Sequence, residues 1–187
     1  MAMDNFREEV VVKHRRGVEN AMYIMSFVFM IFFGVIAFVW FQMLTGAIGV
    51  SGFSTQMIFD IVFFLFAVAA CIMIYLRKDR IKMEYEYTFT NGQMDFAQVY
   101  NNKKRKALGT MNLRNLEACG LVSSGSFQRY ITMQGIKRTN WFLNRESELL
   151  YFFFQKEGQK RIIIIEPSEE MIGLIKKYLP QGVWQNN

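Results

Sequence analysis

The sequence has few of the residues from which metal centres and redox sites are built. Its 187 residues include one histidine, two cysteines and two prolines. His14 has no second histidine or cysteine at a ligand spacing, and neither Cys71 nor Cys119 belongs to a CxxC pair. A disulfide would have to join an apolar block to a predicted strand, so we expect no disulfide, no metal site and no cofactor.

The motifs of the common enzyme classes are also absent. The chain contains no P-loop, GxSxG, HExxH or GxGxxG pattern. Adjacent acids such as Glu169 and Glu170 suit the start of a helix better than an acid/base pair. We therefore predict no catalytic residues and a protein that is not an enzyme.

Long uncharged runs are what the sequence does have. Residues 21–44 form an uncharged run of 24 residues, which as a helix would extend roughly 36 Å. This run is too long and too aromatic for the core of a signal peptide. Residues 57–76 form a second run, interrupted only by Asp60. The two runs predict transmembrane helices 1 and 2 of a hairpin, and hence a membrane protein.

Asp60 lies in the first turn of the second predicted span. There its carboxylate is expected to face headgroup water and to complement the helix dipole. The alternative is a buried functional acid.

The basic residues predict the orientation of the hairpin. They flank both spans, whereas residues 45–56 carry no charge. We therefore expect a multi-pass protein of the cell membrane with residues 45–56 as a short extracytoplasmic loop and both termini cytoplasmic. Residues 1–20 would form an N-terminal arm along the headgroups, and residues 77–187 a cytoplasmic domain. The flanking basic residues are Lys13, Arg15, Arg16, Arg77, Lys78, Arg80 and Lys82. The last four, Arg77, Lys78, Arg80 and Lys82, are also candidates for contact with anionic lipid headgroups.

After Met83 the hydrophobic pattern acquires a period of two, and Asn91-Gly92 predicts the tight turn of a β-hairpin. About eight short strands are expected. The later candidates are 93–100, a strand ending near Leu113, 116–122, 129–133, 141–143, 149–155 and 161–166.

The C-terminal segment predicts a helix over 168–179. Ser168 suits the N-cap, apolar residues follow at helical spacing, and Pro180 ends the pattern. The expected domain is therefore α+β, mainly antiparallel, with the strands bent into a barrel or sandwich that one C-terminal helix closes.

This arrangement resembles the bacterial pleckstrin-homology-like (PH-like) membrane proteins. The resemblance is carried by the segment from Arg105-Lys106 to Leu116. Residues 85–92, the run 103–106 and the segments Ile165-Glu-Pro167 and 175–180 resemble a small Firmicutes family of unknown function. The resemblance implies a fold and no activity.

Eukaryotic relatives of that fold bind phosphoinositides through basic residues around a long first hairpin loop. In this sequence the turn at Asn91-Gly92 is too short for such a loop. A basic run follows in the next connection, where it would contact anionic headgroups or remain a solvated turn. This run is Lys103, Lys104, Arg105 and Lys106.

Six residues, 77–82, join the second span to the first predicted strand, and they extend no further than roughly 20 Å. The domain should therefore stay near the bilayer. The leading hypothesis is a membrane-anchored interaction or scaffold module with a protein partner or a second copy of itself. The alternatives are an anionic-lipid sensor that uses the basic run and an oligomeric channel or transporter subunit. We expect no nucleic-acid partner, because the core requires the aromatic residues.

Overall fold

The computed structural model describes residues 5–48 and 55–186. The chain divides into two compact units, one built from residues 1–14 together with 83–187 and the other from residues 15–82. We call the first unit the sheet domain and the second the helical hairpin. The predicted connector 45–56 lies partly outside the described residues.

The helical hairpin consists of α1 (Gly17–Ile48), α2 (Thr55–Arg77) and a short 3₁₀ turn over Lys78–Ile81. Both helices are long and apolar enough to cross a membrane, and both extend beyond the predicted runs 21–44 and 57–76. They pack through aromatic pairs such as Trp40 on Phe63, whose ring centroids are 5.4 Å apart. Most of their large apolar side chains nevertheless remain exposed.

Asp60 is not placed as the sequence predicted. We expected its carboxylate to face water, but the side chain is buried, with 8% of its surface exposed. Gln56 Nε2, one helical turn earlier, donates a hydrogen bond of 3.4 Å to Asp60 Oδ1. The two residues are four positions apart, so helical periodicity places them on one face of α2.

The first sheet of the sheet domain has the order β1-β2-β3-β4, with all neighbours antiparallel. Its strands are β1 (Phe6–Val11), β2 (Met83–Thr90), β3 (Gln93–Tyr100) and β4 (Lys104–Asn112). In the turn between β2 and β3, Asn91 and Gly92 both adopt positive φ, as the sequence predicted for a tight hairpin turn.

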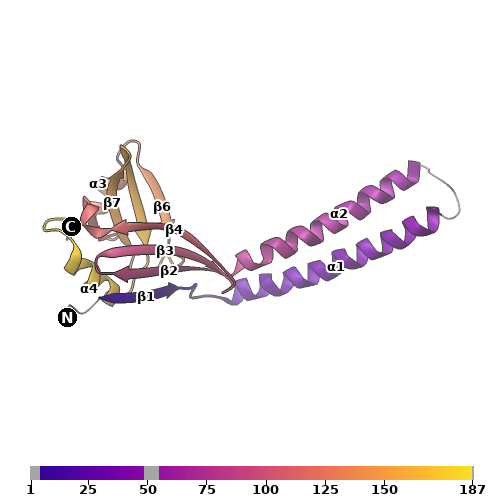
Figure 1. The fold of residues 1–187 in the computed structure, drawn as a ribbon, viewed down its shortest axis with the longest axis horizontal. Coiled ribbons are helices and arrows are strands. Elements are labelled where there is room, and N and C mark those ends of the chain that lie inside the picture. Colours follow the sequence, from indigo (N-terminus) through magenta and orange to yellow (C-terminus); the bar gives the residue numbers. More distant parts are fainter. Residues whose placement is uncertain (1–4, 49–54, 187) are drawn as a thin grey trace. The chain divides into compact units, whose positions relative to one another are not determined.

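Strand β1 corrects the predicted role of the N-terminal arm. Residues 6–11 do not lie apart from the domain, because they pair along β2 from Phe6 opposite Thr90 to Val11 opposite Tyr85 (Figure 1). The helical hairpin is therefore an insertion between two neighbouring strands of one sheet. The predicted boundary of the domain at residue 77 leaves out its first strand.

The second sheet has the order β6-β8-β7-β5-β9, in which β6 with β8 and β5 with β9 are parallel pairs. The strands are β5 (Ala118–Leu121), β6 (Lys137–Trp141), β7 (Leu150–Lys156), β8 (Gln159–Ile165) and β9 (Trp184–Gln185).

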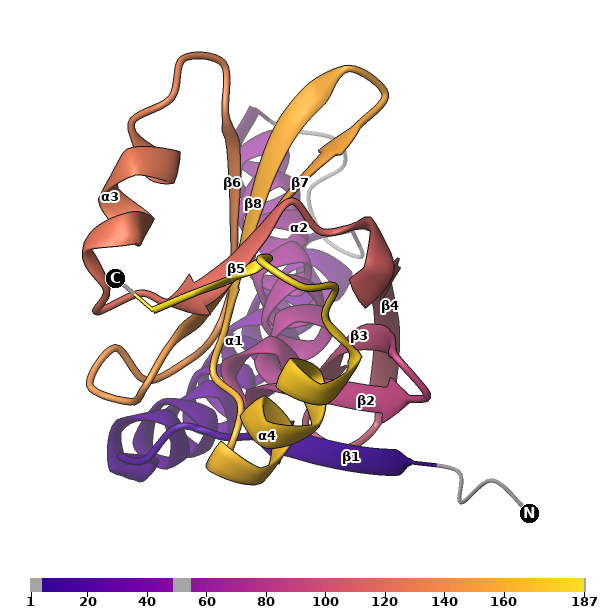
Figure 2. The same cartoon turned by 90° about the vertical axis from the view of Figure 1, so that its left-hand side faces the viewer.

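A helix, α3 (Gly125–Ile131), replaces the strand predicted over 129–133. Its Phe127 packs with Tyr151, Phe153, Ile162 and Ile164 on the face of the second sheet that points away from the first (Figure 2). Because both faces of β7 and β8 are covered, these strands are continuous apolar runs rather than alternating ones.

The main core lies between the two sheets, and α4 (Glu169–Tyr178) closes it. Tyr87 and Phe89 of the first sheet and Phe152 of the second are fully buried there. Met171 and Ile175 of α4 join the same cluster. The fold therefore confirms an α+β domain with two sheets and a C-terminal helix.

Candidate functional site

The end of β1, the start of β2 and the turn between β3 and β4 all lie at the same end of the first sheet. We call this end of the sheet the connected end. Val11, the last residue of β1, lies opposite Tyr85, and Met83, the first residue of β2, lies opposite Tyr100. Tyr100 in turn lies opposite Lys104, so the turn between β3 and β4 is at the same end. The chain leaves the sheet domain for the helical hairpin here and returns here.

The predicted basic run lies at this connected end. Asn101 and Asn102 adopt positive φ of 49° and 53° and tighten the turn, and Asn tolerates this conformation better than most residues. Lys103 follows in the turn, and Lys104, Arg105 and Lys106 begin β4 with exposed side chains. The register of the sheet therefore collects these four cations where the chain joins the hairpin.

Arg105 differs from its neighbours because it forms an ion pair with Glu86 of β2. The Glu86 carboxyl is nearly buried, and this burial, together with a hydrogen bond to Glu8, raises its pKa, while Arg105 opposes the rise. Arg105 therefore has a structural partner within the sheet domain.

The other predicted contact residues belong to the helical hairpin. Arg77 and Arg80 are exposed, whereas Lys78 has only 8% of its surface exposed. The Lys78 ammonium lies over the rings of Phe27 and Tyr75, 5.6 Å and 4.8 Å from their centroids. Lys78 is a predicted candidate for contact with lipid headgroups, and in the hairpin its side chain packs against these two rings.

Lys82, the last residue of the hairpin, also has an aromatic partner. Its ammonium lies 4.6 Å from the centroid of the Tyr23 ring. Cation–π contacts thus hold two of the predicted basic residues against aromatic side chains of α1 and α2.

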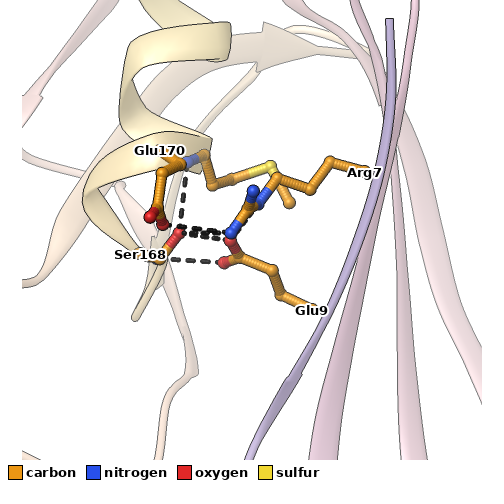
Figure 3. A network of polar contacts seen from close by, with 5 residues as sticks. Arg7, Glu9, Ser168 and Glu170 are labelled. Carbon is orange, nitrogen blue, oxygen red and sulfur yellow. Dashed lines mark hydrogen bonds and ion pairs between the residues drawn. The ribbon is translucent and has the colours of Figure 1, made fainter.

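A polar network fixes β1 to α4 (Figure 3). Arg7 donates to Glu9 Oε1 at 2.6 Å and to Glu170 Oε2 at 3.0 Å. Ser168 caps α4 by accepting from the Met171 amide at 3.2 Å, and its own amide donates to Glu9 Oε2 at 2.9 Å. The hydrogen bond from Ser168 and the nearby Arg7 lower the pKa of Glu170. Sequence reasoning identified Ser168 as the cap but missed its connection to β1.

A second network holds the segment that leaves β1. The buried Glu166 carboxylate accepts from the amides of Leu143 and Asn144, from the Asn144 side chain and from Ser147. Asn144 also donates to the Val12 carbonyl at 2.9 Å and accepts from the His14 amide at 2.9 Å. These contacts anchor the chain just before the helical hairpin begins.

The described residues contain no group of three or more His, Cys, Asp or Glu side chains that could hold a metal ion. Cys71 and Cys119 are both free thiols. Cys119 is fully buried, and burial raises the pKa of its thiol far above the ordinary value. This thiol is therefore poorly reactive at neutral pH.

These features define a PH-like domain of two sheets and a closing helix, with an apolar helical hairpin inserted after the first strand. The chain belongs to the family described as Bacterial PH-like domain (DUF6106), which it matches over residues 3–185. No curated protein and no solved structure matches the chain. Membership defines the kind of domain and assigns it no specific role.

The fold also changes the comparison with eukaryotic relatives. The turn at Asn91-Gly92 joins the second and third strands of the first sheet, not the first and second. The connection between the first two strands is the helical hairpin itself. The expected absence of a long first loop was therefore based on the wrong connection.

Proposed function

We propose that the chain is an integral protein of the cell membrane in which the helical hairpin anchors a non-catalytic binding module, the sheet domain, at the cytoplasmic surface. The observation that carries the proposal is the insertion of the hairpin between β1 and β2. Because these strands are antiparallel neighbours in one sheet, the chain leaves and re-enters the sheet domain at the same end of that sheet. This geometry supports two spans with both termini in one compartment.

The surface of the helical hairpin supports its insertion into a bilayer. In the most apolar stretches of α1 and α2, only 6% and 17% of the residues are buried. A core helix of a water-soluble protein would be mostly buried. Exposed Phe, Ile, Val and Met side chains in this number require an apolar surrounding.

The two connections between the sheet domain and the hairpin favour a domain that is held permanently at the membrane surface. They do not favour a domain that is recruited there from solution. The sheet domain is joined to the anchor both after β1 and before β2, and the networks around Glu9 and Glu166 fix the first of these connections. A domain tethered twice keeps a high effective concentration and a restricted orientation at its surface. Such a domain suits the binding of a partner that is itself at the membrane.

Thiol labelling of spheroplasts tests the proposed orientation. In a Cys71→Ser background, Thr45→Cys places a thiol at the far end of α1, and Lys160→Cys places one on the exposed part of β8. The buried Cys119 should stay silent. We expect an impermeant maleimide to label Thr45→Cys in intact spheroplasts and Lys160→Cys only after permeabilisation. Equal labelling of the two variants, or release of the protein by alkaline carbonate, would contradict the proposal.

Contact with anionic lipid is a second candidate role, favoured by the exposed Lys104 and Lys106 at the connected end. Each cation near an anionic surface contributes about 1 kcal/mol. A polarity-sensitive dye on Asn102→Cys can report this contact in full-length protein reconstituted with or without phosphatidylglycerol.

We expect a blue shift of the dye that needs phosphatidylglycerol, disappears at high salt and is lost in a Lys104→Ser, Lys106→Ser double variant. A Lys160→Ser, Lys177→Ser variant has the same loss of charge elsewhere and should keep the shift. Arg105 stays unchanged because it pairs with Glu86. An identical shift in both variants would exclude this role for the basic run.

A further inference from the structure

A cavity of about 360 Å³ lies in the sheet domain, lined by residues of β4 and of the hairpin of β7 and β8. This volume lies in the range of small-molecule sites. Phe96 and Trp141 form one aromatic wall, with ring centroids 4.8 Å apart, and Phe154 and Leu108 also line the cavity. An apolar body can therefore be enclosed here.

The aromatic wall is fixed before any ligand arrives. Tyr87 is fully buried, and its hydroxyl donates to the carbonyl of Trp141, which holds the end of β6 against the first sheet. Phe96 also contacts Phe152 in the main core. A rigid wall lowers the entropic cost of binding a ligand.

Arg161 brings a positive charge to this cavity, whose lining is part apolar and part polar. It lies on β8 two residues before the core residue Ile163 and opposite Phe154, so strand alternation turns it toward the same inner face. The lining also contains Lys156 and three amide side chains, but no acidic residue among the described residues that border the cavity.

One donor of the Arg161 guanidinium has no acceptor in the part of the chain that the structure describes. Its Nε is buried and has no hydrogen-bond partner among the described residues. A buried donor without an acceptor is unfavourable, and it is seldom found unless something else satisfies it. The Nε and Nη groups of arginine form a planar fork that matches the two oxygens of a carboxylate.

We propose that this cavity binds a small carboxylate with an apolar body, whose carboxylate pairs with Arg161 and whose body packs against Trp141, Phe96 and Phe154. The aromatic wall beside Arg161 favours a carboxylate with an apolar body; Lys156 also lines the cavity, so inorganic phosphate is the competing ligand in the test. The proposal deepens the role of the sheet domain as a binding module, but it does not depend on the orientation of the hairpin in a membrane.

Quenching of Trp141 fluorescence tests the proposal on the full chain in detergent. Trp40→Phe and Trp184→Phe leave Trp141 as the only tryptophan. The probe is 3-(4-bromophenyl)propionate, whose bromine quenches tryptophan at short range, and its uncharged amide serves as the matched control for partition into detergent. We expect saturable quenching by the acid and only weak, unsaturable quenching by the amide.

Variants at Arg161 distinguish specific pairing of the probe's carboxylate with Arg161 from nonspecific apolar binding. Arg161→Gln should weaken binding of the acid by roughly tenfold to a hundredfold, the usual effect of losing a charged hydrogen bond. Arg161→Lys should restore part of the affinity, and Lys160→Gln, on the neighbouring outward position, should change it less than twofold. Unfolding curves of each variant show whether the fold is kept.

Three results would overturn the proposal: equal quenching by acid and amide, unchanged affinity in a folded Arg161→Gln variant, or displacement of the probe by inorganic phosphate at comparable concentration. Failure of thiol labelling to show the expected orientation would leave these results unaffected, because the quenching needs no bilayer. The two proposals therefore fail separately.

Discussion

The sheet domain and the helical hairpin use the same apolar residue types in opposite ways. Phe152 in the sheet domain is fully buried, whereas Phe32 in α1 has 56% of its surface exposed. Two sheets and two helices surround a core in the first unit. The second unit has two helices that touch along one side and leave the rest of their apolar surface open.

This difference indicates what stabilises each unit. Pairing of sheet faces removes apolar surface from water within the sheet domain itself. The helices of the hairpin satisfy their backbone hydrogen bonds internally, which is the requirement for a segment surrounded by lipid. The sheet domain therefore carries its own core, while the hairpin depends on its surroundings for burial.

The same substitution at the two phenylalanines tests this contrast most strongly. Phe152→Ala should lower the free energy of unfolding of the sheet domain by about 3–5 kcal/mol, because it leaves a cavity in the core. Phe32→Ala should change it by less than about 0.5 kcal/mol. Denaturant unfolding of the full chain in detergent, followed by near-ultraviolet circular dichroism, measures both. Similar losses in the two variants would contradict the separation into two units.

A charge in the hairpin should have the next largest effect. Phe32→Arg places a guanidinium in the middle of α1, at a cost of about 2.5–3.5 kcal/mol for insertion into a bilayer. We expect less protein in the membrane fraction after alkaline extraction. Phe6→Arg on β1 is the matched control, because Phe6 is 60% exposed in the sheet domain. Equal retention of both variants would argue against a membrane surrounding for α1.

Local patterns were sufficient for much of the fold. Alternation and Asn91-Gly92 predicted the β2–β3 hairpin, and Ser168 with the following apolar spacing predicted α4. These signals work because the turn and the cap are determined by residues within a few positions of each other.

Elements that depend on distant partners were missed or misassigned. Strand β1 pairs with a strand more than seventy residues away and is fixed to α4 by Arg7 and Glu9. Helix α3 was predicted as a strand, although the unbroken run Leu150–Phe154 indicated a strand covered on both faces and hence a missing cover. The pairing of β1 with β2 and the packing of α3 on the second sheet both depend on residues that are distant in the sequence.

The candidate site was predictable in part for the same reason. Residue identity located the basic run at 103–106, and the strand register then placed it at the connected end. Lys78 and Arg105 were not distinguishable from free surface cations, because their partners Tyr75 and Glu86 come from the tertiary packing and from a strand across the sheet.

Two glycines of the sheet domain allow backbone strain to be compared with steric overlap against a neighbouring side chain. Both Gly92 and Gly158 have positive φ, but a Cβ at Gly92 would lie 2.8 Å from Cδ1 of Tyr178, while nothing lies within 4 Å at Gly158. We expect Gly158→Ala to cost about 1 kcal/mol from the backbone alone and Gly92→Ala about 2 kcal/mol. Unfolding midpoints and slopes measure the difference. A smaller loss at Gly92 would mean that Tyr178 moves aside freely.

The smallest expected effect concerns Glu86, where the sheet domain buries a charge near its connected end. Burial and the contact with Glu8 raise the pKa of Glu86 above the ordinary value of 4.5. The folded state therefore holds this proton more tightly than the unfolded state, and the resulting stability is lost as the pH rises from about 4.5 through the raised pKa.

Glu86→Gln removes this loss while keeping the shape of the side chain. We expect the variant to gain stability relative to the native chain as the pH rises from acidic to neutral, partly offset by the lost ion pair with Arg105. Glu117→Gln, at an exposed position, should show no such trend. Unfolding free energies measured across this pH range would contradict the assignment if the two variants behaved alike, because the burial of Glu86 would then have no energetic consequence.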